Sequence, residues 1–256
     1  MPAETSVRIF PDLPALSLAA AEEFVSRARA AIQARGIFTV VLSGGSTPRT
    51  LYRLLAENPG FKDAVEWDKA HFFFSDERHV PPDHPENNYR MAYRALLSKI
   101  PAPPRNTHRM ATEVAEPEPV AELCEQALRQ FFRLKEGEAP RFDLVLLGMG
   151  ADGHVASLFP GSPALAETRK LAVAVWIDTL EAWRITLTLP VLNNAEEVLF
   201  LVSGASKSQA LRKVLEGAGE AEPLPARAVR PVRGRLLFFA DQEAAKLLTS
   251  ASGHRT

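Results

Sequence analysis

A glycine-rich segment near the middle of the chain carries a histidine and an aspartate two positions apart. The segment GMGADGH covers residues 148–154 and directly follows an apolar run, FDLVLL, at 142–147. Imidazole titrates near neutral pH, so the His154 side chain can take a proton from water and return it later. The sequence therefore predicts a general base at His154 with Asp152 as its neighbour. A purely structural histidine is the alternative.

The same segment also fits a different chemistry, because it contains the pattern GxGxxG of dinucleotide-binding proteins. Asp178 follows at roughly the distance of a carboxylate that binds ribose. Two features argue against this interpretation. Pro160, Gly161 and Pro163 would break the long helix that a dinucleotide site needs, and the His154 ring would crowd the pyrophosphate. We therefore expect no organic cofactor.

A second segment, SGGSTP, follows the apolar run at 37–42 and precedes a helical pattern. Glycines let the backbone turn tightly, hydroxyl groups donate hydrogen bonds, and a helix N-terminus carries positive partial charge. We expect an anion such as phosphate to bind at Gly44, Gly45, Ser46 and Thr47. The lysine of a nucleotide P-loop is absent. The alternative is an ordinary turn that serine or threonine caps.

Three consecutive charges, Asp76, Glu77 and Arg78, follow the apolar run at 71–74. Charges at the end of a buried strand are costly unless they are paired or used. The alternatives to a functional role are a solvated surface loop and a metal site. No metal is expected, because the candidate ligands follow no standard spacing. These candidates are His79, Asp83, His84 and Glu86.

Two cations lie near the later strands. Arg184 precedes an alternating pattern, ITLTL, and Lys207 stands at the start of a helical pattern after VLFLVSG. Lysine is disfavoured in the first turn of a helix unless it faces an anion. Lys207 would then complement the glycine-rich segment at 43–47. Simple exposure to solvent is the alternative for both cations.

Short apolar runs position all of these segments, and they alternate with amphipathic stretches. Runs rich in β-branched and aromatic residues predict buried strands at 37–42, 71–74, 142–147, 198–202 and 235–239. Helices are predicted at 18–35, from Ser17 as N-cap to Gly36 as stop, and at 48–58, 88–97 and 206–215. This alternation predicts an α/β fold with a mainly parallel sheet and helices on both faces. In such folds ligands bind at the carboxyl ends of the strands, where the polar segments lie.

The composition is that of an ordinary globular protein that needs no cross-links. The chain has 256 residues, 46% of them hydrophobic, a net charge of −1 and one cysteine, Cys124. It has no basic block, no signal-peptide pattern and no apolar run of about 18 residues. We expect a cytoplasmic protein with no nucleic-acid or membrane partner. The proline-rich stretches at 100–105 and 217–225 are too short to separate domains, so residues 1–256 are predicted to form a single domain.

Taken together, four segments resemble the 6-phosphogluconolactonase family, within the glucosamine-6-phosphate isomerase/6-phosphogluconolactonase superfamily. They are VLSGGSTP, FFFSDERHVPPDHPENNY, DLVLLGMGADGHVASLFPG and ITLTLPVLNN…VSGASKS, which lie between Val41 and Ser208. SDER separates the chain from the related glucosamine-6-phosphate deaminases. The resemblance implies a Rossmann-like fold. It also implies hydrolysis of 6-phospho-D-glucono-1,5-lactone to 6-phosphogluconate in the oxidative pentose phosphate pathway, without a metal or an organic cofactor.

The resemblance also implies a role for each residue of the site. His154 would activate the water that attacks the lactone carbonyl, with Asp152 beside it. The loop at 44–47 would hold the phosphate together with Arg184 and Lys207. Arg78 would lie in the substrate pocket, and Asp76 and Asn88 near the sugar. The alternatives are an isomerase or deaminase of amino-sugar phosphates and a sugar-phosphate sensor without catalysis.

Overall fold

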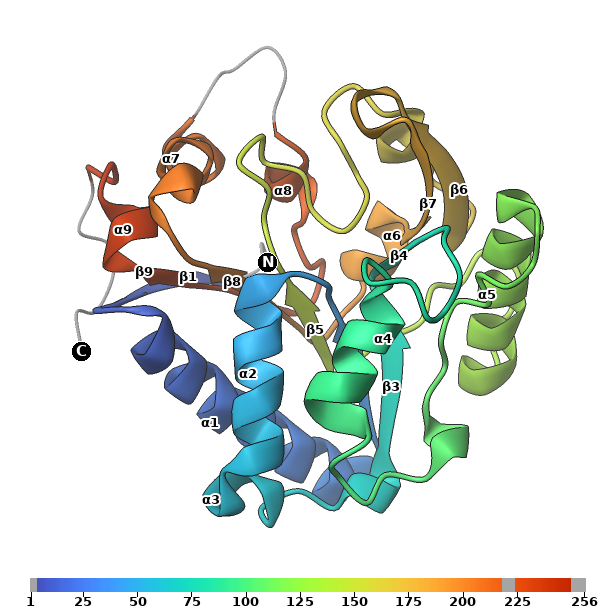
Figure 1. Ribbon diagram of the computed structural model, residues 1–256, viewed down its shortest axis with the longest axis horizontal. Helices are drawn as coiled ribbons and strands as arrows, with labels where there is room; N and C mark the ends of the chain where they lie inside the picture. The colour runs from blue at the N-terminus through green and yellow to red at the C-terminus, as the bar shows by residue number, and fades with distance from the viewer. Residues whose placement is uncertain (1–3, 218–223, 250–256) are drawn as a thin grey trace.

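The main sheet is parallel and has six strands in the order β1-β9-β8-β5-β2-β3 (Figure 1). The computed structural model describes residues 4–217 and 224–249. In sheet order the strands are β1 (Glu4–Phe10), β9 (Arg235–Asp241), β8 (Glu197–Val202), β5 (Leu144–Leu147), β2 (Phe38–Leu42) and β3 (Ala70–Phe74). The five strands that the apolar runs predict are present, which confirms the α/β fold. Strand β1 lies outside the predicted elements and forms the edge beside β9.

Helices cover both faces of this sheet. One face carries α1 (Leu13–Arg35), α2 (Ser46–Glu57) and α4 (Asn88–Ala92), and the other carries α5 (Pro117–Phe132), α7 (Ser208–Glu216), α8 (Pro225–Ala228) and α9 (Gln242–Ala245). The side chains of β2 alternate between two cores, since Val40 and Leu42 face the first group of helices and Val41 the second. Burial on both faces explains why the predicted strands are continuously apolar.

A smaller antiparallel sheet stands beside the end of β3. Its order is β4-β7-β6, with β4 (Asp76–Arg78), β7 (Ala182–Leu187) and β6 (Ala172–Ile177). Ser75 joins the two sheets, because its N–H donates to Leu42 in the main sheet and its carbonyl accepts from Leu187 in the smaller one. The remaining helical turns are α3 (Pro59–Lys62), η1 (Trp67–Lys69), the π-helix η2 (Tyr93–Leu97), η3 (Pro104–Asn106), η4 (Pro163–Ala166), η5 (Asp178–Leu180), α6 (Leu189–Leu192) and η6 (Ala205–Lys207).

The order of the strands opens a crevice between β2 and β5. After β2 the chain moves on to β3, whereas after β5 it moves to β8 and β9 on the other side. The connections that follow β2 and β5 therefore leave the sheet in opposite directions. Such a switch point at the carboxyl ends of the strands is the usual binding place of a Rossmann-like sheet.

Helix boundaries differ from the predicted ones where a local cap decides them. Helix α1 begins at Leu13 rather than residue 18, because the Asp12 carboxylate accepts from the Ala15 N–H at 2.9 Å and acts as N-cap. The predicted cap, Ser17, is buried inside the helix. The predicted stop is confirmed: Gly36 has φ +78° and its N–H donates to Ile32.

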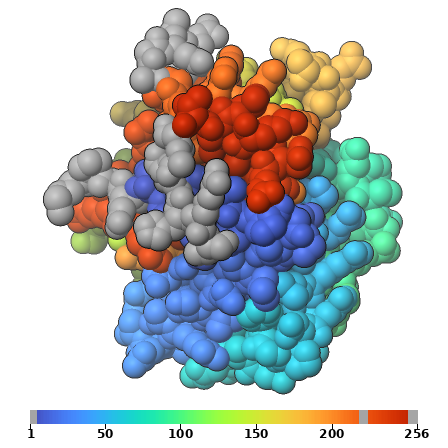
Figure 2. Space-filling view, turned by 90° about the vertical axis from the view of Figure 1, so that its left-hand side faces the viewer, coloured from blue at the N-terminus to red at the C-terminus, as the bar shows by residue number. Residues whose placement is uncertain are grey.

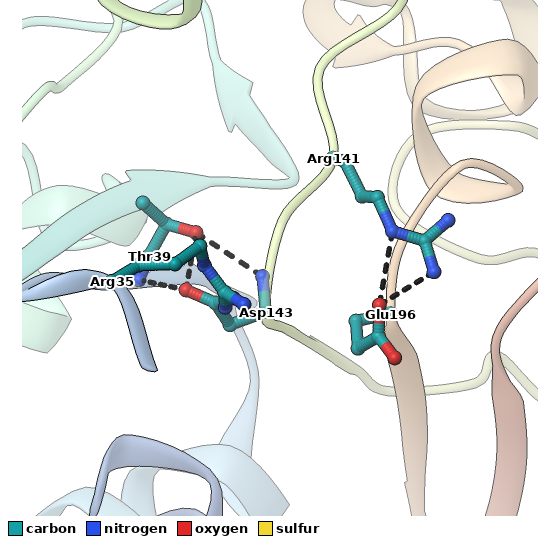
Figure 3. A network of polar contacts seen from close by, with 5 residues as sticks. All are labelled: Arg35, Thr39, Arg141, Asp143 and Glu196. Carbon is teal, nitrogen blue, oxygen red and sulfur yellow. Dashed lines mark hydrogen bonds and ion pairs between the residues drawn. The ribbon is translucent and has the colours of Figure 1, made fainter. Parts of the chain in front are cut away.

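Polar contacts at the amino ends of the strands fix the register of the sheet (Figure 3). The Asp143 carboxylate accepts from the backbone N–H of Thr39 at 2.8 Å and from its hydroxyl at 2.9 Å, and it pairs with Arg35. The Arg141 guanidinium donates to Glu196, just before β8. These contacts link the amino ends of β2, β5 and β8. The loops at the carboxyl ends of these strands therefore start from fixed positions.

Segments from the two ends of the chain lie side by side on the face that Figure 2 shows. Helix α9, in red, contacts β1, in blue. Because β1 pairs with β9, these late and early elements together complete one edge of the main sheet. No helix of the described residues is long and apolar enough to cross a membrane.

His108 lies in an aromatic cluster against the main sheet. Its ring stacks on Phe73 at 4.3 Å between centroids, Phe131 packs edge-on at 5.0 Å, and its Nε2 lies 3.2 Å from Nδ1 of His71. Burial, with a smaller effect of His71, lowers the pKa of His108 to about 4. Burial and the charge of Arg105 also lower the pKa of His71. Both rings are therefore neutral in the folded protein near pH 7.

This cluster should make the folded protein less stable in acid. The unfolded chain binds a proton at His108 with the ordinary pKa of 6.5, whereas the folded chain binds it only near pH 4. The free energy of unfolding should therefore decrease as the pH falls from 6.5 toward 4. Above pH 6.5 the stabilising contribution of the neutral His108 should be fully present. His108→Phe keeps an aromatic ring and removes the proton site, so its unfolding free energy should decrease less over this window.

Urea unfolding curves across this pH range measure the effect. The exposed His84 supplies the control, since His84→Asn removes an imidazole without touching the cluster. If the unfolding free energies of the His108→Phe variant and the parent had the same pH dependence, His108 would not be the cause of the acid sensitivity.

Candidate active site

A cavity of about 190 Å³ lies where the strands of the main sheet end. The loops that follow β2, β3, β5 and β8 meet there, as the positions of the polar segments predict. Nine of the predicted site residues line it: Gly44, Gly45, Ser46, Thr47, Asp76, Arg78, Asn88, His154 and Lys207. The other two, Asp152 and Arg184, are not part of its wall and lie beside His154 and Arg78 respectively.

His154 and Asp152 are in direct contact. The Nδ1 atom of His154 lies 2.7 Å from Oδ1 of Asp152, which also accepts from the His154 backbone N–H at 3.2 Å. Partial burial alone would raise the pKa of Asp152, but the hydrogen bond and charge of His154 outweigh it and hold this pKa below its usual range. An ionised carboxylate at Nδ1 favours the tautomer that carries its proton there. The lone pair of Nε2 is then free to accept a proton.

Packing around His154 gives the glycines of this segment their role. A Cβ atom on Gly150 would lie 2.1 Å from Nδ1 of His154 and 2.3 Å from Oδ1 of Asp152. Gly153 has φ +79°, which lets its N–H donate to Gly150 in a tight turn. The ring of His154 stacks on Phe159 at 4.2 Å between centroids. The second glycine of the GxGxxG pattern therefore leaves room for the histidine–aspartate pair, and the third forms the turn beside it.

The glycine-rich loop after β2 presents an uncapped helix end to the cavity. Gly45 has φ +102° and is the N-cap of α2, but no described side chain accepts from the first N–H groups of this helix. Tyr52, fully buried in α2, fixes the start of the loop, because its hydroxyl donates to the Ser43 carbonyl and accepts from the Ser43 N–H, both at 2.9 Å. The free N–H groups and the helix dipole favour an anion.

Lys207 lies on the other side of this cavity, in the turn after β8. The Asp241 carboxylate anchors that turn, since it accepts from the Ser203 hydroxyl and from the Gly204 N–H. The Lys207 ammonium forms no ion pair with a carboxylate of the described residues. It thus adds positive charge that no ion pair with a described carboxylate neutralises.

Arg78 and Arg184 form a pair of like charges across β4 and β7. They are direct partners in the strand register, and Arg184 is only 8% exposed. Burial, and then the charge of Arg78, lower the pKa of Arg184. Within the described residues their guanidinium groups donate hydrogen bonds only to main-chain oxygens, those of Glu86 and Trp183. The charges of nearby carboxylates act on the pKa of Arg184 in the opposite direction to burial and Arg78. Like charges opposite each other are destabilising, so this pair favours an anion nearby.

Glu77 lies buried beside the site, outside the cavity wall, and the sequence motifs assign it no role of its own. It is 1% exposed, and its carboxylate accepts from the backbone N–H groups of Arg78 (2.9 Å), Asn88 (2.6 Å) and Tyr89 (2.8 Å). Burial raises its pKa to about 7, although these hydrogen bonds act in the opposite direction. Three adjacent charges after a buried strand were the available signal. The solvated-loop alternative is wrong for Asp76 and Glu77, which are both buried.

Asn88 connects the two walls that follow β2 and β3. Its side-chain N–H donates to the Asp76 carbonyl at 3.0 Å. A Cβ atom on Gly44 would lie 2.0 Å from its side-chain oxygen, so only glycine fits opposite it. Asn88 thereby fixes the loop at 44–47 relative to Asp76.

The possible metal ligands after β4 do not come together. His79 contacts the main-chain oxygen of Val114 at 2.9 Å, and His84 accepts from the Glu86 N–H. Across the described ranges, no group of three or more histidine, cysteine, aspartate or glutamate side chains is placed to hold a metal ion.

Comparison with known proteins identifies the family. The family of glucosamine-6-phosphate isomerases/6-phosphogluconolactonase matches residues 11–238. The chain belongs to this family. One relative within it, the 6-phosphogluconolactonase of a Synechocystis strain, is 43% identical over 87% of the chain and 90% of its own length.

Other members of the family agree in sequence and in structure. The 6-phosphogluconolactonase of Mycobacterium tuberculosis is 38% identical over 96% of the chain and 99% of its own length. The solved structure of 6-phosphogluconolactonase from Trypanosoma cruzi has a TM-score of 0.86 at 30% identity and covers 98% of the chain and 99% of its own. The Rossmann-like fold that the resemblance implies is therefore confirmed.

Proposed function

We propose that the chain hydrolyses 6-phospho-D-glucono-1,5-lactone to 6-phosphogluconate, the lactonase step of the oxidative pentose phosphate pathway. The observation that carries this proposal is the contact of Asp152 with His154, which lines a cavity whose wall also holds the cations Arg78 and Lys207. A base and an anion site in one cavity suit a substrate that has both a hydrolysable ester and a phosphate. The names of the relatives support the same activity.

In the proposed reaction, His154 acts as general base. Its Nε2 takes a proton from a water molecule, whose oxygen attacks the lactone carbonyl. Negative charge develops on the carbonyl oxygen and is stabilised by the cations of the cavity wall, of which Arg78 belongs to β4. The intermediate then collapses, the bond to the ring oxygen breaks, and this oxygen takes the proton from His154. No covalent intermediate with the enzyme is needed.

The phosphate would lie between the loop at 44–47 and Lys207. Both line the cavity, and among the residues that the structure describes no side chain caps the N–H groups of the first turn of α2. Arg184 would act on the phosphate through its positive charge beside Arg78 rather than as part of the cavity wall. Asp76 and Asn88 would contact the sugar hydroxyls.

We further propose that the chain works as one domain in the cytoplasm, with a small-molecule substrate and no nucleic-acid partner. Support comes from its balanced charge, −1 overall, and from the lack of a membrane-crossing helix within the described residues.

Base consumption on adding fresh 6-phosphogluconolactone, corrected for spontaneous hydrolysis, tests the proposed function. The parent protein should accelerate it and should be at least about tenfold less efficient on unphosphorylated gluconolactone, because charged hydrogen bonds to the phosphate are lost. Equal efficiency on both lactones would contradict the proposal that the cavity binds the phosphate of the substrate. No rate above the spontaneous one, together with ammonia release from glucosamine-6-phosphate, would favour the deaminase alternative.

A further inference from the structure

Ser157 connects the turn that carries His154 to the opposite wall of the cavity. It is three residues beyond His154 and 1% exposed. Its hydroxyl donates to Oδ2 of Asp76 at 2.8 Å, a contact between residues 81 positions apart. The other oxygen of Asp76, Oδ1, accepts from the Ser75 hydroxyl, also at 2.8 Å. Asp76 thus holds one serine from its own strand end and one from the turn that carries the base.

The turn between His154 and Ser157 needs such a tie, because its backbone is strained. Ala156 has φ +50°, a left-handed conformation that residues with a Cβ atom rarely adopt. Strained conformations persist where the surroundings hold them, and they concentrate at active sites. Backbone hydrogen bonds in both directions between Val155 and Leu158, at 3.3 and 2.9 Å, close this turn from within. Two contacts of Ser157 attach it to the smaller sheet: its hydroxyl to Asp76, and its backbone N–H to the Thr186 hydroxyl at 3.2 Å.

The Asp76 carboxylate is a suitable anchor for this tie. It lines the cavity at 6% exposure and forms no ion pair with the described residues. Its charge acts on Arg184, but the two lie beyond ion-pair distance, so the hydrogen bonds of this carboxylate come from the two serine hydroxyls. Hydrogen bonds to an ionised group are stronger than those between neutral groups. Removal of the Ser157 hydroxyl would therefore cost Asp76 a donor and would remove one of the two contacts that attach the turn of His154 to the smaller sheet.

We infer that Ser157 is a positioning residue that sets the distance between the general base His154 and the sugar-binding wall at Asp76. This inference rests on the proposed lactonase function. Catalysis needs the base within hydrogen-bond reach of the attacking water, and a misplacement of about 1 Å can cost about a hundredfold in rate. The phosphate contacts come from other elements, the loop at 44–47 and Lys207, so Ser157 should affect kcat much more than KM.

The test compares Ser157→Ala with Ser75→Ala, a matched pair in which each variant removes one buried hydroxyl from Asp76. Ser157→Ala should lower kcat by about ten- to a hundredfold, with KM within about twofold, whereas Ser75→Ala should lose far less kcat because the His154 turn keeps its tie. Steady-state kinetics by base consumption gives both constants. Ser157→Cys, with similar size and a weaker donor, serves if the alanine variant does not fold, and should lie between it and the parent.

A second readout separates positioning from general structural support. In a His154→Ala background, Ser157→Ala should cause little further loss, because the base that it positions is gone. Parental kcat in the Ser157 variants, equal losses in the two serine variants, or fully additive losses with His154→Ala would each overturn the inference. A parent protein without lactonase activity would instead overturn the proposed function.

Discussion

Replacing His154 by asparagine is expected to lower kcat by about 10²–10⁴-fold, the range that a general base contributes. Asparagine keeps much of the polarity of the ring but has no nitrogen that accepts a proton. KM should change little, because the loop at 44–47 and Lys207 still hold the phosphate. Base consumption measured over a range of substrate concentrations gives both constants.

The exposed His84 provides the control for this experiment. His84→Asn makes the same replacement outside the cavity wall and should leave kcat unchanged. A His154→Asn variant that folds correctly and keeps near-parental kcat would make His154 structural. Asp76 would then become the leading candidate for the base, and an amino-sugar phosphate would become the favoured substrate.

The sequence allowed the main sheet and the place of the site to be predicted, because each central strand is apolar on both faces. Runs such as those of β2 and β8 are typical of strands in a parallel sheet that helices cover on both faces. Since parallel strands end at one edge, the polar segments after four of them had to meet. The cavity wall shows this result: nine of eleven predicted residues line it.

Elements outside the central strands depend on long-range contacts that the sequence does not display. Strand β1 alternates polar and apolar residues and pairs with β9, more than two hundred positions away in the chain. The register of β4 and β7, which places Arg184 opposite Arg78, likewise depends on how two distant segments pair. The position of Arg184 outside the cavity wall therefore could not be predicted from its place before ITLTL.

Two local features of the site also could not be predicted from sequence patterns. Whether Asp152 contacts His154 depends on the backbone of the turn, where Gly153 at φ +79° folds the two side chains together. In the sequence, Glu77 is one charge among three. Its role follows only from its burial and from the hydrogen bonds that its carboxylate accepts from the N–H groups of Asn88 and Tyr89. Local propensity describes neither, because both depend on tertiary packing.

Replacing Lys207 by alanine should lower kcat/KM for the phosphorylated lactone by about ten- to a hundredfold. A hydrogen bond from a charged donor to a phosphate contributes about 1.5–3 kcal/mol, which corresponds to that range. The ammonium has no ion-pair partner among the described residues, so its removal leaves no carboxylate unpaired and should not destabilise the fold. Kinetics on 6-phosphogluconolactone and on unphosphorylated gluconolactone measure the effect, and only the first substrate should lose efficiency.

Lys213 offers the matched control, because it lies exposed on α7, in the same region of the chain, and does not line the cavity. Lys213→Ala removes the same charge, so a loss of efficiency common to both variants would come from the long-range field rather than from contact with the phosphate. Addition of salt separates the two further, since a field acting through solvent is screened over about 10 Å at 0.1 M ionic strength. Loss of efficiency on both lactones in the Lys207 variant would place this lysine at the sugar or the carbonyl. The phosphate would then have to be held by the loop at 44–47 together with the arginine pair.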